Sequence, residues 1–182
     1  MAIPTETVYG LAVTPSPEGL ARLVETKRRS ADKGVALLVD SIEQVRLLAS
    51  VPPVAELLAQ RFWPGALTLV LPQRPDVPLP ELLTGGRPTI GVRLPDHGVP
   101  RALARRLGPL AVSSANISGQ PDATTAQQVL VSLGDEVALV IDDGPVRGGV
   151  PSTVVACLAD GQLQVLRAGA ITEADVRAAA QK

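Results

Sequence analysis

Strand-like and helix-like segments alternate along this chain, and this alternation limits its possible folds more than any other feature. Apolar runs predict strands at 34–40, 66–71, 90–94, 110–113 and 137–141. Helical patterns fill much of the remainder, at 53–62, 100–107 and 125–133. The 17 Pro and 16 Gly residues are scattered, so they separate short elements instead of forming a linker. The pattern predicts an α/β or α+β domain with a mixed sheet.

Local signals mark where several of these elements begin and end. Ser16 before Pro17, Ser41 and Thr172 have the side chains that cap helix starts, and Pro17 suits a first helical position. Asp160-Gly161 lies between two β-rich runs and predicts a hairpin turn. The Pro- and Gly-rich segment 73–87 is expected to be the longest irregular stretch, and a loop of that length is often functional.

Composition excludes several classes of protein. A chain of 182 residues with 46% apolar residues predicts one domain with a proper core. The net charge of −1 argues against a generic nucleic-acid-binding domain. No apolar run approaches the roughly 20 residues that span a bilayer, and no signal peptide opens the chain, so we expect a cytoplasmic protein without a membrane partner.

The single cysteine and the single histidine both favour structural roles. Cys157 lies in an apolar run with nothing nearby to lower its pKa, which predicts a buried thiol. His97 directly precedes a predicted helix, which predicts a capping role. A His-based metal cluster or a Cys-based zinc site is therefore not expected.

Polar residues gather in a few short segments. The opening segment 4–12 combines Pro, Thr, Glu, Gly and the only tyrosine, so it could be a binding loop or an ordinary turn. Lys27, Arg28, Arg29 and Lys33 could be a solvated helix end or a clamp for phosphate or carboxylate. The turn at 114–121 could cap a loop or bind phosphate oxygens. None of these segments matches a Walker A or Rossmann fingerprint, so positioning and charge neutralisation are the expected chemistry.

Seven motifs in order resemble the YrdC/TsaC family of L-threonylcarbamoyladenylate synthases. They are Pro4 to Leu11, the K-x-R step at 27–29, Phe62-Trp63-Pro64-Gly65 with Thr68, Gly91 to Pro95, the S-x-N step at 114–116, Pro151-Ser152-Thr153 and Arg167-Ala168-Gly169. The resemblance covers nearly the whole chain. It implies one YrdC-like domain over residues 1–182, with a twisted mixed sheet flanked by helices and a concave, positively charged site.

The resemblance also implies a reaction. L-threonine, bicarbonate or CO2, and ATP with Mg2+ would give threonylcarbamoyl-AMP and pyrophosphate. A separate tRNA-modifying threonylcarbamoyl transferase complex would then pass the group to tRNA, with which this chain could also make contact. The amine can form a carbamate without a protein nucleophile, and orientation of the reactants can remove roughly 7 to 11 kcal/mol of barrier. Metal ligands in the protein are not assigned, because phosphates can hold Mg2+ largely by themselves.

Each family role maps onto a residue of this sequence. Lys27, Arg29, Ser114 and Asn116 resemble the catalytic and nucleotide-binding residues, and Arg167 resembles a further nucleotide contact. Thr5, Thr7, Tyr9, Arg93 and Ser152 resemble the residues that bind threonine and bicarbonate. Trp63-Pro64-Gly65 is interpreted as fixing a turn.

The chain departs from the family at its start. Family members usually carry a helix and a strand before the opening loop, where this sequence has Met1-Ala2-Ile3. Loss of that strand would expose its neighbours in the sheet. Two alternative functions remain open at this point. One is an RNA-binding or ribosome-assembly module, and the other is a carbamoyl transferase that uses carbamoyl-AMP.

Overall fold

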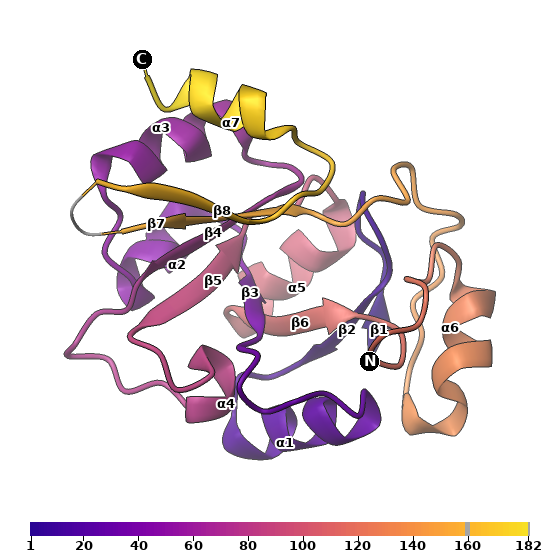
Figure 1. The fold of residues 1–182 in the computed structure, drawn as a ribbon. Helices are drawn as coiled ribbons and strands as arrows, with labels where there is room; N and C mark the ends of the chain where they lie inside the picture. The colour runs from indigo at the N-terminus through magenta and orange to yellow at the C-terminus, as the bar shows by residue number, and fades with distance from the viewer. Residues whose placement is uncertain (159–160, 182) are drawn as a thin grey trace.

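An eight-stranded mixed sheet organises the domain (Figure 1). The computed structural model describes residues 1–158 and 161–181. The strands are β1 Ala2–Ile3, β2 Gly10–Val13, β3 Ala36–Leu38, β4 Leu67–Pro72, β5 Thr89–Arg93, β6 Leu110–Ser114, β7 Thr153–Cys157 and β8 Leu163–Arg167. Their order is β1-β2-β6-β3-β5-β4-β7-β8. The pairs β3–β5 and β4–β7 are parallel and the others antiparallel, which confirms the predicted mixed sheet.

Helices pack around this sheet. They are α1 Pro17–Thr26, α2 Ile42–Leu48, α3 Pro53–Phe62, α4 Glu81–Thr84, α5 Gly98–Leu107, α6 Ala126–Leu133 and α7 Glu173–Ala179, with a 3-10 turn, η1, at Gly134–Glu136. In Figure 1 the β7–β8 hairpin and α7 lie at the top, α1 and α4 at the bottom, and α6 at the right. Within the described residues, no helix has the length and apolar character needed to cross a membrane.

The capping signals are confirmed. The side chain of Ser16 accepts a hydrogen bond from the Gly19 N–H, and those of Ser41 and Thr172 accept in the same way at α2 and α7. His97 caps α5, where its Nδ1 accepts from the Val99 N–H at 3.2 Å. Each bond satisfies an N–H group that would otherwise lack a partner at the first turn.

Two predictions from the sequence are wrong: the strand at 137–141 and the longest irregular stretch at 73–87. Residues 137–141 form no strand and make only an isolated bridge, between Val140 and Ala2, because β1 is two residues long and offers no further partner. The segment 73–87 contains α4, so the longer irregular stretch is 137–152. The predicted hairpin strands β7 and β8 do pair, but Asp160 of the predicted turn lies outside the described residues.

The residues that directly follow Met1 are buried. Ala2 and Ile3 are both 0% exposed. The Ala2 N–H donates to Leu139 O at 2.7 Å, and Ala2 O accepts from the Ile141 N–H at 2.9 Å. Residues 139–141 thus cover the free edge of β1, which is one way in which proteins protect sheet edges.

The main core lies on one side of the sheet. Alternate residues of the central strands belong to it, as the period of two requires. They include Leu37, Leu69, Ile90, Val92 and Val155. The residues between them face the opposite side, where part of the sheet forms the floor of a cavity.

Candidate active site

A cavity of about 710 Å³ lies over the middle strands. Small side chains line its floor, including Ala36, Thr68 and Gly91. These three residues lie on adjacent strands, because Leu37 pairs with Val92 across β3–β5 and Val92 pairs with Leu69 across β5–β4. A floor of small residues leaves room for a ligand close to the backbone of the sheet.

The opening loop forms one wall of this cavity. Thr5 and Thr7 both line it, and their hydroxyl groups lie 2.9 Å apart. Thr5 Oγ1 also donates to Val8 O at 2.7 Å and accepts from the N–H groups of Thr7 and Val8. The Thr5 hydroxyl therefore fixes a tight turn, and the loop is a rigid part of the site.

Tyr9 does not line the cavity, although the sequence places it with the threonine-side residues. The side chain is 0% exposed, and its hydroxyl donates to Gly144 O at 2.8 Å. Next to it, the Gly148 and Gly149 N–H groups donate to the carbonyl oxygens of Glu6 and Thr7, at 3.0 and 2.9 Å. Tyr9 thus joins the opening loop to segment 142–152.

The K-x-R step lies where α1 ends. The Arg28 N–H donates to Glu25 O and the Arg29 N–H donates to Val24 O, which is the Schellman pattern of helix termination. Arg28 has φ of +48° and is the one non-glycine residue with positive φ among those described. This turn leaves Arg28 exposed while Lys27 is buried and Arg29 half-buried. The four cations are therefore not a uniform solvated helix end.

Lys27 is buried behind the cavity and is not among its lining residues. Its Nζ donates to Ser114 O, to Asn116 O at 2.6 Å and to Asn116 Oδ1 at 3.1 Å. Burial, with the nearby charge of Arg29 adding to it and Asp122 opposing it, lowers the pKa of Lys27 to about 8. The ammonium uses all three of its donors to hold the S-x-N turn.

The S-x-N turn places Ser114 at the cavity and Asn116 behind it. Ser114 lines the cavity, and its hydroxyl donates to Asn116 Oδ1 at 2.6 Å. Asn116 is 4% exposed, does not line the cavity, and donates through Nδ2 to Gln120 O at 2.6 Å. Asn116 therefore connects Lys27 to Ser114, and the structure gives the two steps K-x-R and S-x-N a shared network.

Arg29 lines the cavity from the α1 side. Its Nη2 donates to Gly34 O at 2.9 Å and its Nε donates to Lys33 O at 3.2 Å, so the guanidinium is fixed by the following loop. Burial, with the charge of Arg167 adding to it, lowers the pKa of Arg29. Two guanidinium groups that line one cavity favour an anion between them.

Ser152 and Arg167 come together on the opposite side. Arg167 Nη2 donates to Ser152 O at 2.7 Å and contacts Ser152 Oγ at 3.1 Å. The Ser152 hydroxyl also lies 2.8 Å from the hydroxyl of Thr68, which comes from β4. All three residues line the cavity.

Arg93 reaches the cavity from the end of β5. Its Nε donates to Gly65 O at 3.0 Å, and its Nη1 donates to Thr7 Oγ1 at 3.0 Å. Trp63 Nε1 donates to Leu67 O at 2.7 Å and closes the turn that carries Gly65. The interpretation of Trp63-Pro64-Gly65 as a turn is confirmed, and the turn also holds Arg93.

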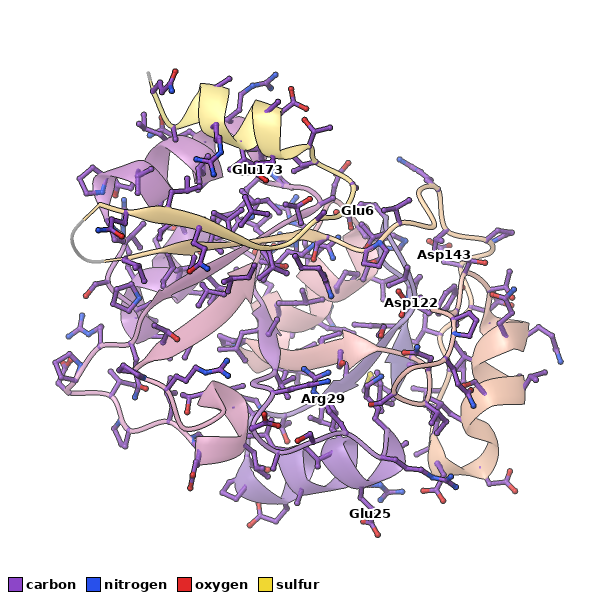
Figure 2. The ribbon with its side chains drawn as sticks, viewed as in Figure 1. Glu6, Glu25, Arg29, Asp122, Asp143 and Glu173 are labelled. Atoms are coloured by element: carbon purple, nitrogen blue, oxygen red, sulfur yellow. The ribbon has the colours of Figure 1, made fainter. Side chains whose placement is uncertain are left out.

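Cationic side chains outnumber carboxylates at this cavity. The cationic lining residues are Arg29, Lys33, Arg87, Arg93 and Arg167, and the acidic one among the described lining residues is Asp122. In Figure 2 Arg29 lies below the central strands and Asp122 to their right. Such a cavity suits an anionic ligand.

Sequence reasoning assigned no site role to Thr68, Arg87 and Asp122, which also line the cavity. Thr68 carried a usable signal, because it is a polar residue inside an apolar strand. Arg87 ends the irregular segment 73–87, part of which does line the cavity. Cys157 lies outside the cavity lining and is buried, as predicted, and burial raises its pKa to about 11.

A comparison with protein families decides the relationship of this chain. The profile of the family Sua5_yciO_yrdC, described as "Telomere recombination", matches residues 1–169. The chain belongs to the Sua5/YciO/YrdC family. The resemblance to this family and its fold are thereby confirmed.

Curated Sua5/YciO/YrdC relatives include threonylcarbamoyl-AMP synthases. The chain is 41% identical to that of Bacillus subtilis over 98% of its own length and 52% of the relative. It is 44% identical to that of Pyrococcus abyssi over 85% of its own length and 46% of the relative. The chain therefore spans about half the length of these two relatives.

Solved structures from the Sua5/YciO/YrdC family have the same fold. Pyrococcus abyssi Sua5 complexed with L-threonine matches with a TM-score of 0.90 and 40% identity, over 98% of this chain and 52% of that one. Escherichia coli YciO matches with a TM-score of 0.80 and 26% identity, over 94% and 84% of the two chains.

Proposed function

We propose that this domain binds ATP and L-threonine in one cavity and converts them, with bicarbonate or CO2, into threonylcarbamoyl-AMP and pyrophosphate. The observation that carries the proposal is the convergence of Arg29, Arg93 and Arg167 on one cavity. The three guanidinium groups come from separate segments, and each is fixed by a backbone carbonyl. The names of the Bacillus and Pyrococcus relatives and the threonine complex of Pyrococcus Sua5 support the same conclusion.

The reaction brings together several anionic groups. The threonine amine adds to CO2 and loses protons to give a carbamate, a carbamate oxygen attacks the α-phosphorus of ATP, and pyrophosphate leaves. Fixed cations and hydroxyl groups lower the barrier by offsetting the charge that gathers on the α-phosphate and the leaving group. This scheme asks the protein to hold and orient its substrates, and no side chain needs to form a bond with them.

We assign Arg29, Arg167, Ser114 and Ser152 to the nucleotide side of the cavity. Arg29 and Arg167 would offset phosphate charge, since a guanidinium matches phosphate oxygens in a bidentate fork. The hydroxyl groups of Ser114 and Ser152 would contact the α-phosphate and the acyl group.

Arg93, with Thr5 and Thr7, would receive the threonine. Lys27 and Asn116 would hold the S-x-N turn that carries Ser114, and Tyr9 would hold the opening loop against segment 142–152. These three are therefore proposed as positioning residues rather than as substrate contacts.

Mg2+ would accompany the nucleotide. Phosphate oxygens and water would hold most of the ion's coordination positions, because Mg2+ at nucleotides takes few protein ligands. Asp122 is the carboxylate in the described lining that could contact it. When bound, the ion would neutralise part of the charge on the phosphates.

The product would serve tRNA modification. A threonylcarbamoyl transferase complex in the cytoplasm would take the acyl group from threonylcarbamoyl-AMP and deliver it to tRNA. Contact between this domain and tRNA itself is part of the same proposal.

Pyrophosphate release tests the activity directly. Purified protein with ATP, Mg2+, bicarbonate and L-threonine should release pyrophosphate, and omission of threonine should abolish the release. Folded protein that releases none would overturn the proposal. Salt-sensitive RNA binding without any effect of ATP on melting temperature would instead favour an RNA-binding module.

A further inference from the structure

The wall of the cavity contains a buried ion pair that is poorly hydrogen-bonded. Glu6 Oε1 lies 2.7 Å from Arg93 Nη2, and the two side chains are 14% and 8% exposed. Within the described part of the chain, neither Glu6 carboxylate oxygen nor Arg93 Nη2 has a hydrogen-bond partner. The pair is close, but its N–H and O groups are badly aligned. Buried charged groups in this condition are costly, so the arrangement calls for an explanation.

The orientation of Arg93 does not depend on Glu6. Two well-formed hydrogen bonds, from Nε to Gly65 O and from Nη1 to Thr7 Oγ1, fix the guanidinium plane. Glu6 makes no hydrogen bond that would add to them. The contribution of Glu6 is therefore its negative charge, which offsets that of Arg93.

The backbone holds Glu6 in place. Glu6 O accepts from the Gly148 N–H at 3.0 Å, and the next residue, Thr7, accepts from the Gly149 N–H at 2.9 Å. In Figure 2 Glu6 lies above the central strands, near the end of the β7–β8 hairpin, and Arg29 lies below them. The carboxylate thus stays beside Arg93 and apart from Arg29.

We propose that Glu6 is the internal counter-ion of Arg93, and that it weakens and so tunes the binding of a substrate carboxylate to that guanidinium. The inference rests on the proposed function, in which Arg93 receives the carboxylate of L-threonine. A nearby negative charge reduces the attraction between Arg93 and the ligand, by Coulomb's law at short range in a partly dry site. Removal of that charge should therefore strengthen binding of a carboxylate. In the protein without ligand, the positive charge of Arg93 would then have no counter-ion in Glu6.

The test compares Glu6→Gln with Glu25→Gln. Glu25 is an exposed residue of α1, so its substitution gives the same change in net charge without touching the pair. Calorimetry would measure binding of L-threonine and of L-threoninamide, which lacks the carboxylate, beside an ATP analogue that cannot be cleaved next to its α-phosphate. We expect Glu6→Gln to bind L-threonine at least threefold more tightly than wild type. Glu6→Gln should bind L-threoninamide no more tightly than wild type does. Glu25→Gln should bind both ligands with the affinity of wild type.

The outcomes separate the two proposals. Wild type that binds no L-threonine would overturn the proposed function and this inference with it. Suppose that wild type binds L-threonine and that Glu6→Gln binds L-threonine, but not L-threoninamide, more weakly. This result would leave the proposed function standing and overturn the counter-ion role. Equal weakening of both ligands would also overturn it and would make Glu6 a receptor for the ammonium group.

Melting without ligand gives a second readout. Glu6→Gln should melt at a lower temperature than Glu25→Gln, since Arg93 loses its counter-ion, and bound L-threonine should narrow that gap. An unchanged melting temperature would contradict the inference. If Glu6→Gln fails to fold, Glu6→Asp replaces it, because the shorter side chain keeps the negative charge but holds it farther from Arg93. Glu6→Asp should increase the affinity for L-threonine by a smaller factor.

Discussion

Replacement of Lys27 by Met tests whether a buried ammonium organises the site. Met has a similar length and apolar stem, so the substitution removes the charge and the donors with little change in packing. Ser114 O, Asn116 O and Asn116 Oδ1 would lose their shared donor. We expect the variant to fold but to be less stable at pH 7.

The magnitude follows from two opposing terms. Asn116 O is left without a donor, which costs about 2 kcal/mol, while Ser114 O keeps the Asn116 N–H and Asn116 Oδ1 keeps the Ser114 hydroxyl. These two acceptors each lose a charge-assisted hydrogen bond worth about 1.5 kcal/mol, so the loss totals about 5 kcal/mol. The pKa of Lys27 falls from 10.5 to about 8 on burial, which means that keeping the charge in the folded protein costs roughly 3 kcal/mol. Met removes that cost, so the free energy of unfolding should fall by about 2 kcal/mol.

The lowered pKa of Lys27 also predicts how the stability difference between wild type and Lys27→Met changes with pH. Below pH 8 Lys27 is protonated in both folded and unfolded chains. Between pH 8 and 10.5 the unfolded chain holds more protons, so the contribution of Lys27 to the free energy of unfolding rises with pH. The difference in stability between wild type and the Met variant should therefore grow over this range, by up to roughly 3 kcal/mol.

Urea denaturation at pH 7 and pH 10 measures both quantities. The fluorescence of Trp63, the only tryptophan, reports the transition. Lys33→Met is the matched control, because this exposed lysine lies in the loop that follows and its loss should change stability by less than about 0.5 kcal/mol. A Lys27→Met protein as stable as wild type, or a gap that narrows as pH rises, would refute the reasoning.

Three further predictions follow from the site and the core. Arg29→Ala should raise the barrier to pyrophosphate formation by about 1.5 to 3 kcal/mol through loss of a charge-assisted contact, and kcat/KM equal to wild type would place Arg29 outside the reaction. Arg28→Gly relieves roughly 1 to 2 kcal/mol of left-handed strain and adds about 0.5 to 1 kcal/mol of chain entropy cost, for a net gain of about 0.5 to 1 kcal/mol. Urea titration checks that gain, and a loss of stability would contradict the strain. Burial and the raised pKa of Cys157 predict that DTNB labels this thiol at pH 8 only when urea unfolds the protein, and rapid labelling of native protein would show it to be accessible.

Periodicity and capping chemistry made most of the elements predictable. The segment 53–62 matches α3, and Ser41 and Thr172 cap helices as expected, because these signals act within one turn of chain. The segment 137–141 has the same apolar character as a strand and still forms none. Its pairing depends on the length of β1, which lies more than a hundred residues away and leaves no trace in the local pattern.

The site was predictable in its membership more than in its geometry. Motif order assigned Arg29, Arg93 and Arg167 to one site, and all three line the cavity. The spacing K-x-R could not show that Lys27 is buried against the S-x-N turn, since its acceptors in Asn116 lie 89 residues further along the chain. The contact between Glu6 and Arg93 joins distant parts of the chain, so no local signal predicts it.

The link between the opening loop and segment 142–152 has a consequence for synthesis of the protein. Glu6 and Thr7 find their backbone partners in Gly148 and Gly149, about 140 residues later. At roughly 5 to 20 residues per second, a ribosome needs on the order of 7 to 30 s to make that interval. During this time the loop that will line the cavity lacks these partners and is open to other binders, including chaperones. The first wall of the site to be translated is therefore among the last to be completed.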